Sequence, residues 1–317
     1  MAHSIRIGVN LHPSSVTSFP DDIEKMLCKF QKVGFEVVEL PLHALQVVVG
    51  GRIMEKRANM IANILKNFNF EYSIHPPNRL NLMDISNLDI QKDVFKSMID
   101  FANFIGSSIV VYHSGLIYLD DEKVDHSYVR KAMEIEVDEL KKLADYAAKR
   151  NIKIAVENAC STTRTIADIS NLKPGCIFDY GADLLNLKTQ VEKVGRENVG
   201  ITLDTGHAYI SSRHLKFNLL EQVQEISDMV IHVHLHDNFG RVEKPENNHV
   251  NLLPFGFHDL HMPPGWGEIP FESILPYVTH AKMWILEVRP LYNAYYEAKE
   301  FVENMFERLK IEATRRF

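Results

Sequence analysis

The chain has 317 residues, of which 45% are hydrophobic and 24% are charged. This composition is typical of a globular protein with a sizeable core, and it excludes a disordered or fibrous chain. The net charge of −7 is unfavourable for a partner as anionic as nucleic acid, although a local basic patch could still bind one. No apolar run approaches the roughly 20 residues that a membrane helix needs, so we expect no membrane partner.

The N-terminus and the cysteines bear on the cellular compartment. Residues Met1–Arg6 contain no apolar targeting segment. Cys28, Cys160 and Cys176 are spaced for neither a disulfide framework nor a zinc knuckle, which agrees with a reducing compartment. We therefore predict a cytoplasmic protein in which Cys160 is a small apolar residue.

Short apolar runs alternate with segments of helical period along the chain. The runs are nearly continuous, as expected for parallel strands that are buried on both faces. Eight strand–helix units in a chain of this size predict a closed (β/α)8 TIM barrel, with a doubly wound sheet as the alternative because alternation alone does not show closure. No linker-like segment interrupts the pattern, so we predict a single domain over residues 1–317. The predicted strands are Ile5–Asn10, Glu36–Leu40, Glu71–His75, Ser108–His113, Ile152–Glu157, Asn198–Asp204, Val230–His236 and Met283–Val288.

The segments between the predicted strands carry apolar residues at helical spacing. Two amphipathic helices are marked by the sets Ile23, Met26, Leu27, Phe30 and Met133, Val137, Leu140, Ala144. Further helices are predicted at about 52–67, 89–105, 180–193, 215–227, 271–279 and 294–310. Two loops are long, 158–179 and 237–270, and long loops in compact domains are often functional.

Histidines and carboxylates stand at or near the ends of six predicted strands. In a parallel barrel these ends open on one face, where the active sites of this architecture lie. Charged groups that meet there would repel one another or be desolvated unless a cation compensates them. Histidine and carboxylate are ligands of zinc and manganese, so the pattern predicts bound divalent metal ions. The histidines and acids in such positions are His75, His113, Glu157, Asp204, His207, His232, His234, His236, Asp237, His258, Asp259, His261 and Glu287.

Taken singly, each of these residues has an ordinary structural explanation. Asp204 could cap a helix or start a turn, and His261 could be a surface loop residue. Alternation places His232, His234 and His236 on one face of their strand, so we choose His234 as the ligand and place His236 at the rim. The remaining histidines lack such a context and are predicted to be surface or structural residues: His3, His43, His126, His214, His249 and His280.

The motifs Leu203–His207, His234–Asn238 and Asp259–Ile269 resemble those of the xylose-isomerase-like TIM barrel superfamily. The resemblance extends from about Ile5 to Phe306. This superfamily contains many sugar isomerases and epimerases as well as the endonuclease IV type of abasic-site nuclease (AP endonuclease family 2). The resemblance therefore implies a barrel enzyme without selecting one reaction.

Similarity to the sugar branch implies one divalent ion held by Glu157, Asp204, His234 and Glu287, with His207 contacting the substrate. The implied reaction is isomerisation or epimerisation of a sugar or sugar derivative by proton transfer through a metal-stabilised enediolate. Glu157 and Glu287 would be the catalytic carboxylates. The Pro-Pro-Gly-Trp-Gly stretch that starts at Pro263 also looks like a loop of this branch.

Similarity to the nuclease branch implies three zinc ions held by nine ligands, and none of the nine is missing. Matched motif by motif, they fall on His75, His113, Glu157, Asp204, His207, His234, Asp259, His261 and Glu287. Glu157 would then bridge two zinc ions, and a bridging hydroxide would attack a phosphodiester. DNA binding needs cationic loops and base-parting wedges, whereas few basic residues can be placed near the rim: Arg79, Arg241, Lys244 and Arg289. We therefore favour the sugar enzyme, with one to three ions per chain, over the trinuclear phosphodiesterase. A metal-bound sugar-binding module or lyase is a third hypothesis.

Residues outside the ligand set could contact the substrate. Asn10 and Glu39 lie at the ends of the first two strands and are predicted to bind it by hydrogen bonds. Arg241 is a candidate for the basic residue that the sugar branch has shortly after His234, and Trp266 either stacks on a sugar or pins its loop. The insertion 241–258 is a lid, a dimer contact, a substrate-selecting loop or a tolerated surface insertion. The oligomeric state stays open.

Overall fold

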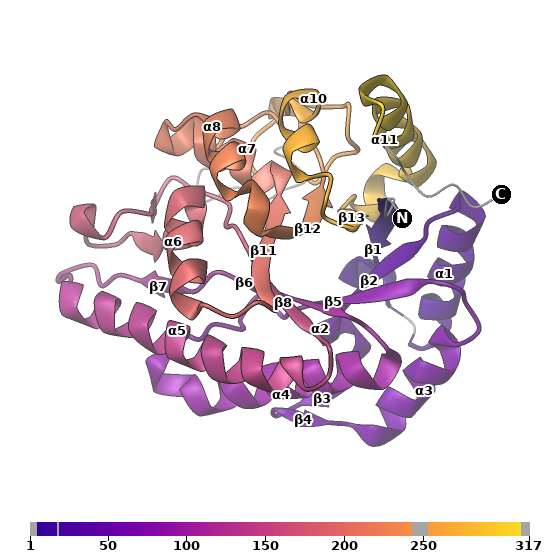
Figure 1. The fold of residues 1–317 in the computed structure, drawn as a ribbon, viewed down its shortest axis with the longest axis horizontal. Coiled ribbons are helices and arrows are strands. Elements are labelled where there is room, and N and C mark those ends of the chain that lie inside the picture. Colours follow the sequence, from indigo (N-terminus) through magenta and orange to yellow (C-terminus); the bar gives the residue numbers. More distant parts are fainter. Residues whose placement is uncertain (1–4, 18, 243–252, 312–317) are drawn as a thin grey trace.

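The computed structural model describes residues 5–17, 19–242 and 253–311. The main strands are β1 (Arg6–Asn10), β2 (Val37–Pro41), β5 (Glu71–His75), β6 (Ile109–His113), β8 (Lys153–Glu157), β11 (Val199–Asp204), β12 (Val230–Leu235) and β13 (Met283–Leu286). They form a closed barrel in the order β1-β13-β12-β11-β8-β6-β5-β2, with every neighbouring pair parallel (Figure 1). The predicted (β/α)8 barrel is confirmed, and closure excludes the doubly wound sheet.

Helices surround the barrel strands (Figure 1). The α-helices are α1 (Asp21–Val33), α2 (Leu42–Leu45), α3 (Glu55–Leu65), α4 (Leu88–Ile105), α5 (His126–Ala148), α6 (Leu184–Val194), α7 (Thr205–Leu215), α8 (Leu219–Ile226), α10 (Phe271–Ile274) and α11 (Tyr295–Leu309). The 3-10 helices are η1 (Pro13–Ser15), η2 (Ile85–Asn87), η3 (Ile169–Asn171), η4 (Tyr180–Ala182), η5 (Ser227–Met229), η6 (Leu253–Phe255), η7 (Leu275–Val278) and η8 (Pro290–Tyr292). Among the helices of the described ranges, none combines the length and hydrophobicity needed to cross a bilayer.

The helix α7 was not predicted. The sequence left open whether Asp204 caps a helix or starts a turn, and in the structure α7 begins at the next residue and continues to Leu215. The Asp204 side chain accepts a hydrogen bond from the backbone N–H of His207 at 2.7 Å, so Asp204 caps this helix. The same carboxylate also lies among the other candidate ligands, 3.8 Å from His234 Nδ1.

The predicted loop 158–179 also contains secondary structure. β10 (Ile177–Asp179) pairs with β7 (Leu116–Tyr118) on one side and with β9 (Thr165–Ile166) on the other in a small three-stranded sheet. Elsewhere, β3 (Val48–Val49) pairs with β4 (Arg52–Ile53) in a hairpin. Strands of two or three residues are too short to show a period in the sequence. In the insertion 241–258, residues 243–252 lie outside the described ranges, so the prediction for its role stays untested.

A buried polar network supports the end of β6. Glu136 of α5 is fully buried and accepts hydrogen bonds from the Tyr112 hydroxyl (2.7 Å), the backbone N–H of Gly115 (2.9 Å) and the amide of Gln190 (3.1 Å). Tyr112 therefore points away from the barrel interior, as strand alternation predicted. Because buried polar groups are stable only when they are paired, this network fixes the turn that follows His113.

Candidate functional site

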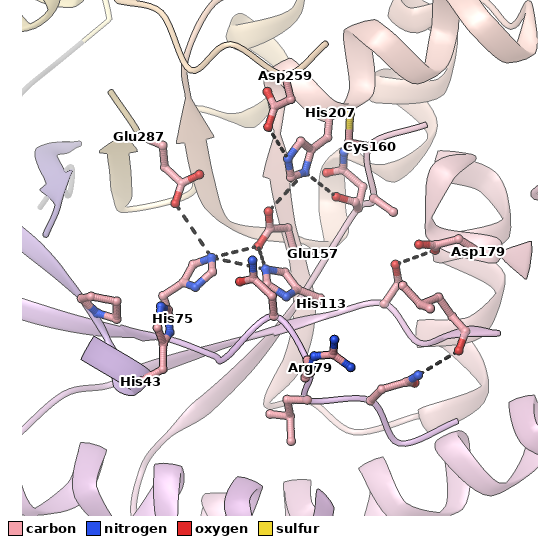
Figure 2. A pocket seen from close by; sticks show the side chains of 18 of the residues that line it. His43, His75, Arg79, His113, Glu157, Cys160, Asp179, His207, Asp259 and Glu287 are labelled. Atoms are coloured by element: carbon pink, nitrogen blue, oxygen red, sulfur yellow. Dashed lines mark hydrogen bonds and ion pairs between the residues drawn. The ribbon is translucent and has the colours of Figure 1, made fainter. Parts of the chain in front are cut away.

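A cavity of about 1200 Å³ opens at the carboxyl ends of the barrel strands. Most of the predicted ligands line it: His75, His113, Glu157, His207, Asp259, His261 and Glu287. Asp204 and His234 lie beneath them and are completely buried. Figure 2 shows how side chains from separate strands point toward one another around Glu157. All nine predicted ligands thus belong to one connected cluster.

The first group of donor atoms surrounds Nδ1 of His234. Carboxylate oxygens of Glu157, Glu287 and Asp204 lie 3.5, 3.7 and 3.8 Å from this nitrogen. Two ligand atoms that share a tetrahedral zinc ion lie about 3.3 Å apart, because each is about 2.0–2.1 Å from the ion. The observed spacings are close to this value, and they unite the residues that the resemblance to the sugar branch assigned to one ion.

The second group comprises His75, His113 and Glu157. The Nε2 atoms of the two imidazoles lie 3.3 Å apart, and Glu157 Oε2 is 3.4 Å from His113 Nε2 and 3.9 Å from His75 Nε2. Nδ1–H of His75 donates to the carbonyl oxygen of Pro76 at 2.9 Å, so in the neutral ring Nε2 carries a lone pair. A lone pair that faces a second imidazole nitrogen and a carboxylate suits a shared cation.

The third group lies on the other side of Glu157. Asp259 Oδ2 is 2.6 Å from His261 Nε2 and 3.3 Å from His207 Nε2. Nδ1–H of His207 donates to the carbonyl oxygen of Asn158 (3.0 Å), and Nδ1–H of His261 donates to that of Glu287 (2.9 Å). Backbone carbonyls that bind the outer nitrogen of an imidazole are the usual supports of metal-ligating histidines, because they fix the tautomer and the ring orientation.

Neighbouring charges and burial act in opposite directions on the pKa values of these groups. Burial would raise the pKa of Glu157, but the imidazoles of His234 and His113 hold this pKa well below its usual range. Burial would lower the pKa of His234, but Glu287, Glu39 and Glu157 raise it well above its usual range. For His113 burial prevails and lowers the pKa to about 4, so its ring is neutral at neutral pH, the form that binds metal.

Several donor atoms of the cluster are buried without a hydrogen bond. Both carboxylate oxygens of Glu157, Nδ1 of His234 and Oδ1 of Asp259 are in this state. Unpaired buried polar atoms are costly, and a divalent cation would satisfy these with its coordination bonds. Imidazole and carboxylate donors suit zinc and manganese. The residues present therefore fit the metal that the sequence predicted.

Two supporting residues were missed or misplaced by the sequence. His236 was expected at the rim, yet its side chain is completely buried. Its Nε2 is 3.0 Å from Asp204 Oδ1, and its Nδ1 is 3.4 Å from Asp259 Oδ1, so it joins the first and third groups. His232 is also completely buried, with its Nε2 3.4 Å from Glu39 Oε2. Strand alternation correctly placed these histidines on one face but did not show their depth.

The residues expected to bind substrate are placed in different ways. Asn10 lines the cavity, and its side-chain oxygen is buried without a hydrogen bond. Glu39 also lines the cavity, but its carboxylate is 3.0 Å from His234 Nε2 and accepts a hydrogen bond from Ser73 at 2.8 Å. This position suits orientation of the His234 ring better than contact with a sugar. Asn10 therefore stays the better candidate for hydrogen bonding to a substrate.

The structure does not bring Trp266 or Arg241 to the cavity lining. The indole N–H of Trp266 donates to Glu297 of α11 at 2.6 Å, in agreement with loop pinning and not with stacking on a sugar. Arg241 donates to the backbone oxygen of Phe255 at 2.6 Å and so holds its own loop. The expectation that these two side chains contact substrate is not supported by their positions.

Asp237 fastens the loop that carries the Pro-Pro-Gly-Trp-Gly motif. Its carboxylate accepts backbone hydrogen bonds from Asn238, Gly265, Gly267 and Ile269 at 2.9–3.2 Å. Met262 forms a bridge with the backbone of Asp237. The motif thus has a structural role here, since it presents the preceding Asp259 and His261 to the cavity.

The histidines predicted to be peripheral differ in position. His43 is exposed, as predicted, and also lines the cavity. His126 is structural as predicted, since its ring bonds to the carbonyl oxygen of Ile169 at 3.2 Å. His214 and His280 lie outside the cavity lining. His3 and His249 lie outside the described residues.

Fold and site together define a (β/α)8 barrel with a cavity of imidazoles and carboxylates at the carboxyl ends of its strands. Residues 29–305 match the family model described as xylose isomerase-like TIM barrel. The chain belongs to this family, as its motifs suggested. It is also 23% identical over 266 residues to an uncharacterized protein of Methanocaldococcus jannaschii, a match that covers 83% of this chain and 76% of that protein.

Solved structures share this fold. A D-tagatose 3-epimerase-like protein is 22% identical, with a TM-score of 0.69 and coverage of 96% of this chain and 98% of that one. An L-ribulose 3-epimerase is 14% identical, with a TM-score of 0.65 and coverage of 96% of both chains. The IOLI protein, whose crystal structure has a bound zinc atom, is 17% identical, with a TM-score of 0.64 and coverage of 98% and 100%. The structural neighbours named here include sugar epimerases.

Proposed function

We propose that the protein is a divalent-metal-dependent isomerase or epimerase that acts on a sugar or sugar derivative. The observation that carries the proposal is the buried donor group around His234 Nδ1, with Glu157, Asp204 and Glu287 at 3.5–3.8 Å. These four residues would hold one divalent ion. The sugar epimerases that share this fold support a sugar as the substrate class.

When bound, the ion would polarise the carbonyl and hydroxyl oxygens of the substrate. Glu157 and Glu287 are assigned the proton transfers, because their carboxylates approach the cavity from β8 and from the end of β13. His75 Nε2 lies 3.9 Å from a carboxylate oxygen of each. The neighbouring imidazoles that hold the pKa of Glu157 low keep it deprotonated and able to accept a proton from a carbon beside a carbonyl.

Other residues would position the sugar. Asn10 offers an unpaired side-chain oxygen to a substrate hydroxyl. His207 lines the cavity between Glu157 and Asp259, 3.3 Å from each, and we assign it a contact with substrate in the one-ion enzyme. In that enzyme the third donor group serves binding and orientation.

The test is incorporation of deuterium from solvent into a panel of keto- and aldo-sugars, followed by NMR after addition of manganese or zinc. We expect exchange at a carbon next to the carbonyl of at least one sugar. Glu157→Gln should abolish this exchange with the circular dichroism spectrum unchanged, while Glu134→Gln, on the exposed face of α5, should retain it. Undiminished exchange in Glu157→Gln would place the chemistry elsewhere, and no exchange with any sugar would refute the proposal.

A second candidate is a trinuclear zinc phosphodiesterase of the abasic-site endonuclease kind. The specific observation in its favour is that the second and third donor groups are complete beside the first, with Glu157 shared between two of them. This enzyme should hold three zinc ions by elemental analysis and cleave an abasic oligonucleotide. Absence of cleavage at stoichiometric enzyme with zinc restored would eliminate it.

A further inference from the structure

One arc of the cavity rim carries four nitrogen donors beside the carboxylates of Glu39, Asp84 and Glu287. Arg289 follows β13, His12 follows β1, His43 lies in α2 after β2, and Arg79 follows β5. These four strands are consecutive in the barrel, in the order β13-β1-β2-β5, so the four side chains occupy one continuous segment of the rim. The metal-type carboxylates of Glu157, Asp204 and Asp259 come from the opposite segment.

The two arginines of this arc are not neutralised by carboxylates of the described residues. Arg289 donates one hydrogen bond, from Nη2 to the backbone oxygen of Asp259 at 3.1 Å, and forms no ion pair there. Arg79 is exposed, lines the cavity, and has neither a hydrogen bond nor an ion pair within the described ranges. In Figure 2 no dashed line joins it to another residue drawn. The nearby carboxylate of Asp84 accepts hydrogen bonds from Asn87 at 2.9 and 3.2 Å.

His12 adds a neutral donor to the arc. The backbone N–H of Ser14 donates to His12 Nδ1 at 3.2 Å, so the neutral ring carries its proton on Nε2. Burial lowers the pKa of His12 to about 4, with smaller contributions from His261 and Arg289, so the ring is neutral at neutral pH. The arc thus offers two guanidinium groups and one N–H donor to a ligand in the cavity.

The cavity is also larger than a simple sugar requires. Its volume of about 1200 Å³ exceeds the range of about 300–1,000 Å³ that is usual for pockets enclosing drug-sized ligands. A monosaccharide at the donor group around His234 would leave space toward the rim. A substituent on the sugar could fill that space and reach the arc.

We propose that the substrate is a sugar derivative with an anionic group, a phosphate or a carboxylate, that binds to Arg79 and Arg289. Guanidinium groups bind both anions through paired, charge-assisted hydrogen bonds. The inference rests on the proposed function, because it assigns the substrate class of that same site. Arg79 is the specificity-determining residue, since it has no structural contact to maintain.

The test measures binding by isothermal titration calorimetry with the zinc- or manganese-loaded protein. The ligands are neutral pentoses and hexoses, their terminal phosphates, the matching uronic acids, and inorganic phosphate. At least one anionic sugar should bind about tenfold or more tightly than its neutral counterpart, and the phosphate and carboxylate arms identify the group. Arg79→Gln should remove about tenfold of this preference without changing the affinity for the neutral sugar. The matched control Arg52→Gln, on the exposed β4 hairpin, should leave it unchanged.

Other outcomes overturn the inference. Equal affinity for charged and neutral sugars would show that the cavity has no anion site. A preference that survives Arg79→Gln would refute the role of Arg79 and assign anion binding to Arg289 or to the metal. Tighter binding of an abasic DNA duplex than of every sugar, weakened in Arg79→Gln, would assign the arc to nucleic acid. An Arg79-dependent anionic sugar that shows no deuterium exchange would refute the proposed reaction while upholding the anionic ligand. Deuterium exchange confined to neutral sugars would refute the anionic substrate while upholding the proposed reaction.

Discussion

Asp179 should make the stability of the barrel depend on pH near neutrality. Its carboxylate lies at the cavity wall on β10, is 6% exposed, and accepts hydrogen bonds from the Ser114 hydroxyl (2.9 Å) and the Gly181 N–H (3.0 Å). Burial raises the pKa of Asp179 to about 7, although these hydrogen bonds lower it. Asp179→Asn retains the shape and the acceptor oxygen but cannot ionise, so it isolates the effect of this charge.

The sign and size of the effect follow from proton linkage. The folded-state pKa of about 7 is above the ordinary value of 3.8, so between these values the folded protein binds more protons than the unfolded chain. The contribution of Asp179 to stability is therefore fully present below pH 3.8 and is lost as the pH rises through 7. One pKa unit corresponds to about 1.4 kcal/mol, so the loss between pH 5 and pH 8 is about 2–3 kcal/mol.

The assay compares the free energies of unfolding of wild type and Asp179→Asn in urea at pH 5, 6, 7 and 8. The variant should gain about 2–3 kcal/mol relative to wild type over this range. Asp168→Asn is the control: hydrogen bonding from Ser170 lowers the pKa of Asp168, so it is ionised in both states above pH 5 and its variant should show no such trend. A difference between Asp179→Asn and wild type that is constant from pH 5 to pH 8 would refute the linkage argument.

Three further predictions concern the site and its support. Gly206→Ala should lower the free energy of unfolding by about 1–3 kcal/mol and weaken metal binding measured by calorimetry, because a Cβ at this position would overlap the ring of His236. An unchanged free energy of unfolding and an unchanged metal affinity would show that the ring can move. Tyr112→Phe should lower the free energy of unfolding by about 1–3 kcal/mol, because Glu136 and the backbone N–H of residue 82 lose a buried partner. Binding of zinc at pH 7 should release protons, because neighbouring carboxylates, against the effect of burial, raise the pKa of His234 well above its usual range. Calorimetry in buffers of different ionisation enthalpy measures the number of protons released, and no release would contradict the assignment of His234 as a ligand.

The barrel and the donor cluster could be predicted because both follow from short-range patterns. Strands buried on both faces leave continuous apolar runs in the sequence, and parallel closure brings their carboxyl ends to one face. His75, His113 and Glu157 each end such a run, so their meeting required no knowledge of the loops. The recurrence of histidines and carboxylates at the ends of successive strands indicated the site more strongly than any single residue did.

The start of α7 was missed for a reason that lies in the site. Gly206 lowers the helical signal of this segment, because glycine is a poor helix former. The structure requires a small residue here, since the His236 ring packs against the position where a Cβ would be. The low helix propensity of glycine is therefore outweighed by close packing between two segments that are distant in the sequence. Such conflicts between local propensity and tertiary packing are expected near functional residues.

The depth of His236 and the positions of Trp266 and Arg241 depend on long loops. The Asp237 carboxylate accepts hydrogen bonds from backbone N–H groups of the loop and so holds residues 263–269 against the end of β12. This packing buries His236 beneath Asp259. The same loop sends the Trp266 side chain toward Glu297 of α11 and away from the cavity. Nothing in the spacing of the motif predicts which direction such a loop takes.

The shared position of Glu157 explains why a complete ligand set does not select a reaction. Its Oε1 faces His234 and His207, and its Oε2 faces His75 and His113. An ion held at the first group would therefore alter the charge that the second group experiences, so the two groups cannot bind metal independently. The number of ions bound then depends on their relative affinities, whereas the reaction depends on what the cavity admits beside them. For that reason we expect the rim of the cavity, where Arg79 and Arg289 are located, to determine whether a sugar or a phosphodiester binds. The metal-binding side chains beneath the rim do not determine it.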